Sequence, residues 1–150
     1  MIPAELRLDD ADSTGRLGAA VAGALRAGDA VCLWGTLGAG KTTLARALIR
    51  ALTRPDEEVP SPTFTLVQTY DGPDFPIAHF DLYRLKGPEE VRELGLDEAL
   101  DEGAALIEWP ERLEGRLPPD RLDIVLAIED EGRRARLVPH GAWEGRTLEF

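Results

Sequence analysis

The stretch that decides the fold reads Gly35-Thr36-Leu37-Gly38-Ala39-Gly40-Lys41-Thr42. It matches the phosphate-binding pattern G-x-x-x-x-G-K-[S/T] at every fixed position. The apolar run Ala30 to Trp34 precedes it and is typical of a buried strand, while Thr43 to Leu52, rich in Ala, Leu and Arg, predicts a helix. Strand, glycine loop and helix in this order indicate a phosphate-binding loop, or P-loop.

The residue types of this loop suit phosphate chemistry. Glycines let the backbone wrap closely around an anion with its N–H groups pointing inward, and the helix N-terminus adds positive potential. Lys41 is expected to reach the β- and γ-phosphates, and the Thr42 hydroxyl to bind Mg²⁺. Lys41 is one of two lysines among 17 Lys and Arg residues, which favours a specific role for its compact charge.

Size and charge narrow the function classes. The 150 residues predict a single domain spanning 1–150, with no room for a separate substrate domain. A net charge of −11 disfavours binding to DNA, bare RNA or an acidic membrane, so any role near RNA is expected to run through a protein partner. Cys32 is the single cysteine, which excludes an intrachain disulfide. Without a signal peptide or a membrane-length apolar run, we expect a cytoplasmic enzyme.

Short apolar runs alternate with helical stretches, a pattern typical of an α/β sheet. The first helix is expected to be capped by Asp12 or Ser13 and to end near Arg26. The remaining expected elements are strands at Ile2–Leu8, Phe64–Tyr70, Ile77–Tyr83, Ala104–Ile107, Leu122–Ile128 and Arg134–Val138, and short helices at Pro88–Leu94 and Leu96–Leu100. The second and third of these strands predict one antiparallel hairpin, and the last two predict another.

A P-loop enzyme needs an acidic group near its metal, commonly at the end of a neighbouring strand. Glu108 ends the run Ala104–Ile107 and so has the form of a Walker B acid. Asp81 is the second candidate, because in a strand it shares one face with His79 and Tyr83. Either acid could hold Mg²⁺ or orient the attacking water, and the pattern leaves that choice open.

Three further features have both a functional and a structural interpretation. Ser61-Pro62-Thr63 follows an exposed loop, so it is either a γ-phosphate-sensing segment or an ordinary proline turn. Trp109 is expected to pack internally, with partner contact as the alternative. The stripe of Arg46, Arg50 and Arg54 favours a solvated basic face over a contact with RNA or an acidic partner.

The absence of asparagine excludes the usual guanine-recognition motif and argues against a GTPase. A small-molecule P-loop kinase is the main alternative enzyme class, and it needs an acceptor pocket and usually an arginine-bearing lid over the phosphates. The stretch Gly115 to Arg121 offers Arg116 and Arg121, although its two prolines favour a rigid connection. A nucleotide-gated binding module, in which hydrolysis resets a complex, is the third class.

Four segments together resemble the TsaE (YjeE) family of small bacterial ATPases. They are Gly35 to Thr43, Ser61 to Val67, His79 to Leu85 and Ile107 to Glu111. The segments occur in the family's order and spacing, and the resemblance extends from about Leu17 to Arg134. The second and third segments are more specific to the family than the P-loop.

The resemblance implies a P-loop NTPase-type three-layer α/β fold with a mixed, mainly parallel central sheet. An antiparallel hairpin would be inserted between the P-loop helix and the Walker B strand. It implies ATP and Mg²⁺ as cofactors and slow hydrolysis by the protein alone, in the N6-threonylcarbamoyl modification of adenosine 37 in tRNA. The implied partner is a TsaD–TsaB-type heterodimer, with tRNA reached indirectly through that complex.

The resemblance also implies roles for particular residues. Lys41, Asp81 and Glu108 are the expected catalytic residues, and Thr42, Glu108 and Asp81 are the expected Mg²⁺ contacts. The expected nucleotide-binding residues are Gly35, Thr36, Leu37, Gly38, Ala39, Gly40, Lys41, Thr42, Thr43, Ser61, Thr63, Trp109 and Arg133. Residues 11–14 are expected near the adenine, Arg133 beside the base or ribose, and Arg84 as a possible internal contributor to catalysis.

Overall fold

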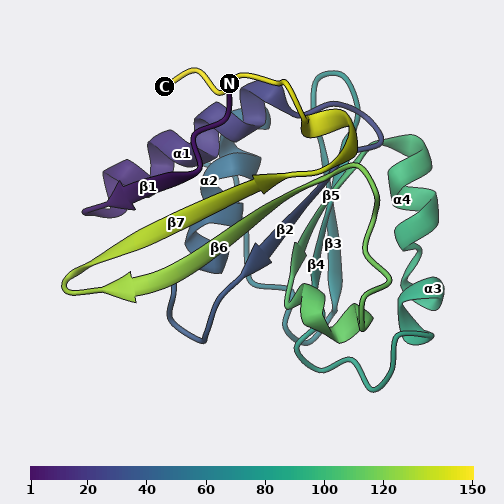
Figure 1. Cartoon of the computed structure of the whole chain (residues 1–150). Helices are drawn as coiled ribbons and strands as arrows, with labels where there is room; N and C mark the ends of the chain where they lie inside the picture. The colour runs from purple at the N-terminus through teal and green to yellow at the C-terminus, as the bar shows by residue number, and fades with distance from the viewer.

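The computed structural model describes residues 1–150 as alternating strands and helices (Figure 1). The strands are β1 (Glu5–Leu8), β2 (Ala30–Trp34), β3 (Val67–Asp71), β4 (Pro76–Asp81), β5 (Ala104–Glu108), β6 (Arg121–Glu129) and β7 (Gly132–Pro139). The α-helices are α1 (Ala11–Ala24), α2 (Lys41–Leu52), α3 (Glu90–Leu94) and α4 (Leu96–Glu102). Two 3₁₀ turns, η1 (Pro110–Leu113) and η2 (Gly141–Trp143), follow β5 and β7.

The strands form one seven-stranded sheet in the order β1-β7-β6-β2-β5-β4-β3. The four central strands β6, β2, β5 and β4 pair in parallel, whereas β3, β7 and β1 add antiparallel pairs at the two sides. Because β1 is antiparallel to β7 and β7 is antiparallel to β6, β1 runs in the same direction as β6. Five of the seven strands therefore point one way, and the expected mixed, mainly parallel sheet is confirmed.

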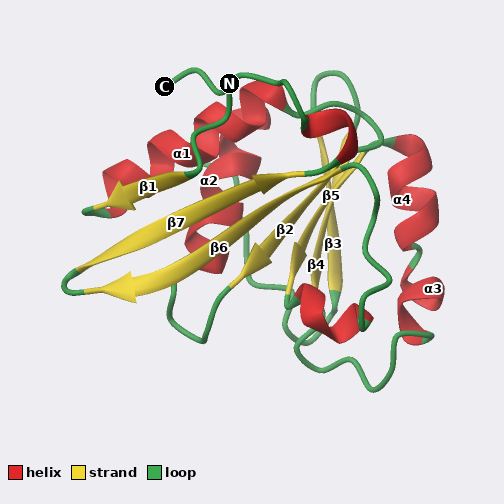
Figure 2. Ribbon diagram, in the orientation of Figure 1, coloured by secondary structure: helices red, strands yellow, loops and turns green.

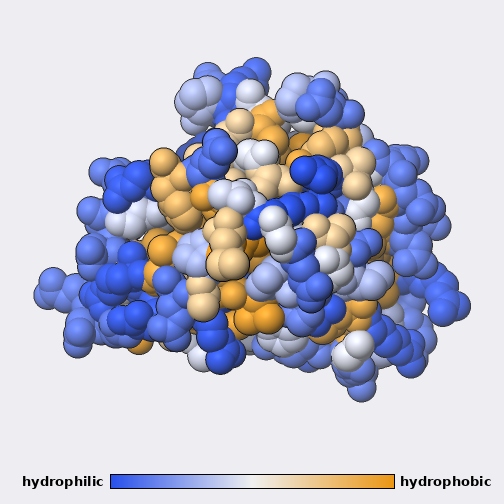
Figure 3. Space-filling view, turned by 45° about the horizontal axis from the view of Figure 1, so that its top comes forward, coloured by the Kyte–Doolittle hydropathy of each residue, from blue (hydrophilic) through white to orange (hydrophobic).

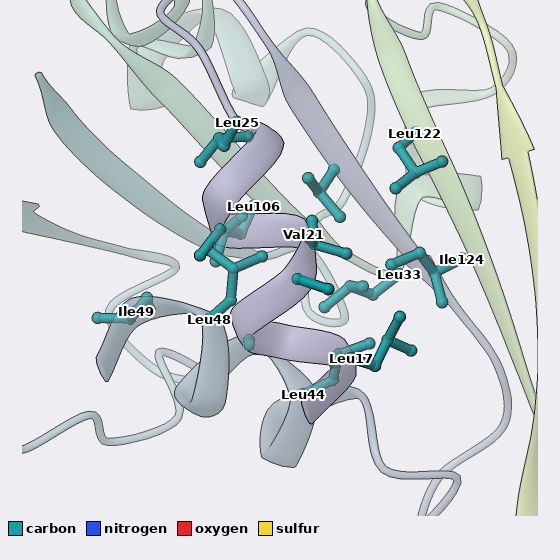
Figure 4. Close-up of a cluster of buried hydrophobic side chains, with 14 of the residues drawn as sticks. Leu17, Val21, Leu25, Leu33, Leu44, Leu48, Ile49, Leu106, Leu122 and Ile124 are labelled. Carbon is teal, nitrogen blue, oxygen red and sulfur yellow. The ribbon is translucent and has the colours of Figure 1, made fainter. Parts of the chain in front are cut away.

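Helices cover both faces of this sheet, giving three layers (Figure 2). The alternation of side chains along β2 shows the two faces: Val31 and Leu33 join the core beneath α1 and α2, while Ala30 and Cys32 join the core beneath α4. The larger core unites α1 and α2 with the sheet through Leu17, Val21, Leu25, Leu44, Leu48, Ile49, Leu33, Leu106, Leu122 and Ile124 (Figure 4). Apolar side chains therefore bury both faces of the central strands.

The parallel register brings three functional segments to one edge of the sheet. The P-loop follows the carboxyl end of β2, where Leu33 pairs with Glu108 at the end of β5. Glu108 in turn pairs with Asp81 at the end of β4. Both candidate acids therefore lie at the same edge as the P-loop, which is where ligands bind in open α/β sheets.

The boundaries of two expected elements were wrong. Helix α1 is capped by Asp10, whose carboxylate accepts a 2.8 Å hydrogen bond from the Ser13 backbone N–H, and the helix ends at Ala24. Strand β3 begins only at Val67, because Leu66 adopts a left-handed conformation (φ 69°) and donates its N–H to the Pro62 carbonyl. The segment before β3 is therefore a turn, which carries Thr63 toward the edge of the sheet.

The surface is hydrophilic over much of its area. Hydrophilic residues cover both sides of the molecule in Figure 3, and apolar residues show mainly in the middle of that face. None of the helices combines the length and the apolar character that a membrane crossing requires.

Gly18 is expected to be required for the close approach of α1 to α2. A Cβ at this position would lie 2.8 Å from the Ala47 Cβ and 3.0 Å from the Leu48 backbone nitrogen. Overpacking of this kind should lower the free energy of unfolding of Gly18→Ala by about 1–2 kcal/mol, measured by urea denaturation.

Gly15 supplies the matched control, because it lies on the same helix and a Cβ there would meet nothing within 4 Å. Gly15→Ala should raise the free energy of unfolding by about 0.5–1 kcal/mol, through helix propensity alone. Equal stabilisation by both alanines would contradict the packing assigned to Gly18.

Candidate functional site

The P-loop has the backbone of an anion cradle. Gly38 (φ 81°) and Gly40 (φ 105°) adopt left-handed conformations that glycine accepts without strain. Gly40 precedes α2 and provides no side-chain cap, so the N–H groups of the first turn of α2 have no intrahelical acceptor. Together with the dipole of the twelve-residue helix α2, these N–H groups suit the oxygens of a phosphate chain.

Lys41 is held at this cradle by two contacts. Its ammonium donates to the Gly35 carbonyl and lies 3.3 Å from the centre of the Trp109 ring. Burial lowers the pKa of Lys41, and three nearby carboxylates, of which Glu108 has the largest effect, offset part of that shift. The site thus keeps a 95% buried cation beside the loop, which is the charge that a phosphate requires.

Trp109 follows directly after β5 and is held in an uncommon conformation (φ 61°). Its ring packs against Tyr83, with ring centres 4.9 Å apart and planes tilted by 53°. The tryptophan therefore does more than fill the core: its face stabilises the Lys41 ammonium by a cation–π interaction.

A hydrogen-bonded chain connects the P-loop helix to two strands. The Thr42 hydroxyl donates to one oxygen of Glu108 at 2.9 Å, and the other oxygen lies 2.7 Å from His79 Nε2. Glu108 and His79 are 2% and 0% exposed. The Walker B form of Glu108, predicted from its place at the end of an apolar strand, agrees with this position beside Thr42.

Asp81 belongs to a second group, built on the turn before β3. One of its oxygens accepts from the Thr63 hydroxyl at 3.1 Å and from the Ser61 hydroxyl at 3.5 Å, and these two hydroxyls lie 2.8 Å apart. The other oxygen accepts from the Tyr83 backbone N–H at 3.0 Å. Asp81 therefore fixes the Ser61–Thr63 segment to the end of β4.

The oxygens gathered here fit Mg²⁺. Thr42 supplies a hydroxyl, and Glu108 and Asp81 supply carboxylates from adjacent strand ends that line one cavity. Mg²⁺ prefers oxygen ligands and is commonly bound by one or two carboxylates together with phosphate oxygens and water. An incomplete set of protein ligands beside a phosphate cradle matches that preference.

Arg133 braces the P-loop from the β6–β7 hairpin. Its guanidinium donates to the Ala39 carbonyl at 3.1 Å and to the Gly38 carbonyl at 3.0 Å. These bonds fix the outer side of the loop. The expectation of an arginine beside the base or ribose placed Arg133 at the site, but its hydrogen bonds are to the loop itself.

Most of the expected site residues line a single cavity of about 290 Å³: Leu37, Gly38, Gly40, Lys41, Thr42, Thr43, Ser61, Thr63, Asp81, Glu108, Trp109 and Arg133. Gly35, Thr36 and Ala39 do not line it. Gly35 instead permits close packing, because a Cβ there would lie 2.7 Å from the Leu126 carbonyl oxygen. Ala39 is fully buried and donates its N–H to Thr36, closing the turn of the loop.

A second cavity of about 240 Å³ adjoins the first and shares Gly40, Thr43 and Arg133 with it. Ala11 and Thr14 of α1 also line this cavity. The segment expected near the adenine, residues 11–14, therefore lies beside this cavity.

Several arginines have roles other than those expected from the sequence. Arg84 stacks on Phe64, 4.5 Å from the ring centre, and does not line the phosphate cavity. Arg46 and Arg50 donate to the Val59 and Glu57 carbonyls, so this stripe anchors the loop that leads to Ser61.

Arg121, the last residue of the stretch considered as a kinase lid, lies at the opposite edge of the sheet from the P-loop. Arg121 pairs with Ala30 at the start of β2, about four residues or ~13 Å from the end that carries the P-loop. Its guanidinium is bonded to Asp123 and to the Pro118 carbonyl. Arg116 lines a separate cavity beside α3.

His79 is the site residue that sequence analysis failed to assign. The sequence predicted that His79 and Asp81 lie on the same face of a strand, because they are two residues apart. Its bond to Glu108 depends on the pairing of β4 with β5, which sequence spacing does not reveal.

Comparisons with known proteins identify the family of the chain. The family model described as "Threonylcarbamoyl adenosine biosynthesis protein TsaE" matches residues 8–136. A Rickettsia felis protein named tRNA threonylcarbamoyladenosine biosynthesis protein TsaE is 39% identical over 145 residues, covering 97% of this chain and 85% of that protein. A protein of the same name from Aquifex aeolicus is 38% identical over 133 residues, covering 87% and 91%.

Among solved structures, the crystal structure of Bacillus subtilis YdiB superposes with a TM-score of 0.75 at 31% identity. The superposition covers 91% of this chain and 85% of that one. With the seven-stranded sheet and the strand–loop–helix at its centre, this match assigns the chain an α/β fold of the P-loop type.

Arg133 should control how tightly the P-loop binds phosphates. Arg133→Ala removes both bonds to the loop carbonyls, so the loop should lose its fixed shape. We expect roughly tenfold weaker binding of inorganic triphosphate, about 1.4 kcal/mol, measured by isothermal titration calorimetry.

Arg136 lies three residues along β7 and is exposed, so Arg136→Ala removes the same charge without touching the loop. Equal losses of affinity in the two variants would mean that general charge, and not bracing of the loop, is responsible.

Proposed function

Since the chain belongs to the TsaE family, we propose that it is a slow, Mg²⁺-dependent ATPase required for the N6-threonylcarbamoyl modification of adenosine 37 in tRNA. It acts in the cytoplasm with a TsaD–TsaB-type heterodimer, and its ATP cycle lets that complex turn over repeatedly. The observation that carries the proposal is the cavity in which Lys41, Thr42, Asp81 and Glu108 meet at the P-loop.

The proposed reaction is in-line attack of water on the γ-phosphate of ATP. Lys41 and the amides of the P-loop would balance the charge that develops on the phosphate oxygens. A small movement of the Lys41 ammonium away from the Trp109 ring would be enough, because the ammonium already lies beside the loop. The adjoining cavity between Thr14 and Arg133 would hold the nucleoside.

Thr42, Glu108 and Asp81 would hold Mg²⁺, which supplies charge neutralisation between the phosphates and the carboxylates when it is bound. Asp81 has a second role, because its carboxylate already fixes the hydroxyls of Ser61 and Thr63. A γ-phosphate that attracts either hydroxyl would compete with Asp81 for it. This competition gives the Ser61–Thr63 segment two alternative partners, which is what a nucleotide-sensing switch requires.

The small-molecule kinase is the weaker alternative. The stretch that could have served as its lid, Gly115–Arg121, ends in Arg121, which is bonded to Asp123 at the opposite edge of the sheet. No arginine other than Arg133 lines the phosphate cavity, and Arg133 is bonded to the loop. A slow intrinsic rate follows from this, because an arginine directed at the γ-phosphate accelerates hydrolysis strongly.

The partner is expected to contact the rim of this cavity. Leu37 at the tip of the P-loop and Phe64 beside the switch segment are 70% and 81% exposed, and Tyr83 is 39% exposed. A protein that covers these side chains could complete the site with a positive charge. The acidic net charge disfavours direct binding of tRNA, so the tRNA would be reached through the complex.

ATP hydrolysis measured with Mg²⁺, first alone and then with the TsaD–TsaB pair, tests the proposal. We expect a slow rate alone that rises when the pair is added. Lys41→Ala should lower kcat/KM by at least about a hundredfold, or ~2.7 kcal/mol, because the phosphate charge would be unmatched.

Lys86→Ala is the matched control, since Lys86 is exposed and is the other lysine of the chain. Normal hydrolysis by Lys41→Ala would refute the site. Phosphate transfer that requires a small-molecule acceptor, at a rate that the TsaD–TsaB pair does not change, would favour the kinase.

Asp81→Asn should uncouple the switch segment from β4. The amide keeps the size of the side chain but loses the charge that the two hydroxyls share. We expect kcat to fall by roughly 10–100-fold while the unfolding temperature stays within a few degrees, because the change is at the edge of the core.

Asp71→Asn provides the comparison, because Asp71 is an exposed acid at the end of β3. If Asp81→Asn hydrolyses ATP and supports turnover of the complex at the rates of the unmodified chain, Asp81 has only a structural role.

A further inference from the structure

His79 is a buried titratable residue that the mechanism above does not use. It is 0% exposed and lies in β4 between Ala78 and Phe80, both of which face the core beneath α4. By strand alternation its ring points to the opposite face, toward α2 and the P-loop, together with Ile77 and Asp81. Burying an imidazole here costs desolvation free energy, whereas an apolar side chain could fill the same space without that cost.

The ring has a single hydrogen bond, and that bond is to Glu108. In the β4–β5 pairing His79 lies opposite Leu106, so Glu108 is its diagonal neighbour, within reach of a long side chain. His79 Nε2 lies 2.7 Å from Glu108 Oε2, whereas Nδ1 is buried without a partner in the protein. A carboxylate that binds a metal ion only accepts hydrogen bonds, so in the proposed site Nε2 would be the donor.

The bond holds Oε2 of the Glu108 carboxylate, while Oε1 faces the P-loop helix. Glu108 Oε1 accepts from the Thr42 hydroxyl at 2.9 Å, so the two oxygens are held from opposite sides by His79 and Thr42. The Thr42 hydroxyl donates its one proton to Glu108 and keeps two lone pairs, so its oxygen could face a metal ion without losing this bond. Thr42 would then hold the inner oxygen of the carboxylate, and the bond to His79 would hold the outer one.

We propose that His79 is a positioning residue, which holds the Glu108 carboxylate oriented toward the metal position beside Thr42. This inference rests on the proposed Mg²⁺-dependent ATPase. A hydrogen bond to the outer oxygen also raises the affinity of the inner oxygen for a cation by fixing its direction, as outer partners do for metal ligands. His79 touches neither the nucleotide nor the reacting water.

Three variants separate positioning from packing. His79→Leu keeps the volume approximately and removes the donor. His79→Gln can place an amide N–H at the position of Nε2, whereas the shorter side chain of His79→Asn places its amide nearer to the position of Nδ1. His140→Gln is the matched control, because His140 is the other histidine and is paired with Asp123 away from the cavity.

The readout is the affinity for a non-hydrolysable ATP analogue with and without Mg²⁺, measured by calorimetry beside kcat and KM. For His79→Leu and His79→Asn we expect the gain in affinity caused by Mg²⁺ to fall roughly 10–100-fold, with affinity in its absence within about twofold of the unmodified chain. kcat should fall in parallel, and His79→Gln should restore most of both losses.

A Mg²⁺-dependent gain that survives in both His79→Leu and His79→Asn would overturn the assignment. So would an equal loss of affinity with and without Mg²⁺, which indicates a packing role. If His79→Leu does not fold, the comparison of Gln with Asn decides alone, since both are polar and similar in volume. Failure of the unmodified chain to bind the analogue would refute the proposed ATPase itself, which keeps the two failures distinct.

Discussion

The parallel pairing of β2 with β5, and of β5 with β4, is the constraint on which the site depends. It places Leu33 beside Glu108 and Glu108 beside Asp81, so the P-loop and both acids leave the sheet at one edge. Burial of apolar side chains on both faces fixes this register, because a slip of one residue would turn every side chain to the opposite face. The packing of the core thus determines where the P-loop, Glu108 and Asp81 lie.

Within that frame, the site keeps its charged groups in place through contacts among themselves. Lys41 rests on the Trp109 face and the Gly35 carbonyl, while Thr42 and His79 hold the two oxygens of Glu108. Each contact involves a group that a phosphate or a metal ion would also engage. Because these groups are already ordered, little side-chain entropy remains to be lost when a ligand binds. Ordering in advance favours electrostatic stabilisation of a transition state over tight binding alone.

How much of this could be predicted depended on the distance along the chain between the interacting residues. The P-loop, the end of β5 and the face shared by His79 and Asp81 follow from local patterns, and the sequence predicted them. The contacts of Glu108 with His79, 29 residues away, and with Thr42, 66 residues away, require the strand order, which no local pattern contains. The start of β3 was wrong for a different reason, since Leu66 adopts a left-handed backbone conformation that its residue type does not favour.

The balance of charge at the site explains why a metal ion belongs in the proposed mechanism. The chain carries a net charge of −11, and the cavity sets Asp81 and Glu108 against Lys41, while Arg133 is engaged with loop carbonyls. A triphosphate entering this cavity would meet two carboxylates where its terminal phosphate must lie. A divalent cation held by Asp81 and Glu108 would offset this repulsion. In the proposed mechanism, affinity for the nucleotide therefore depends on Mg²⁺.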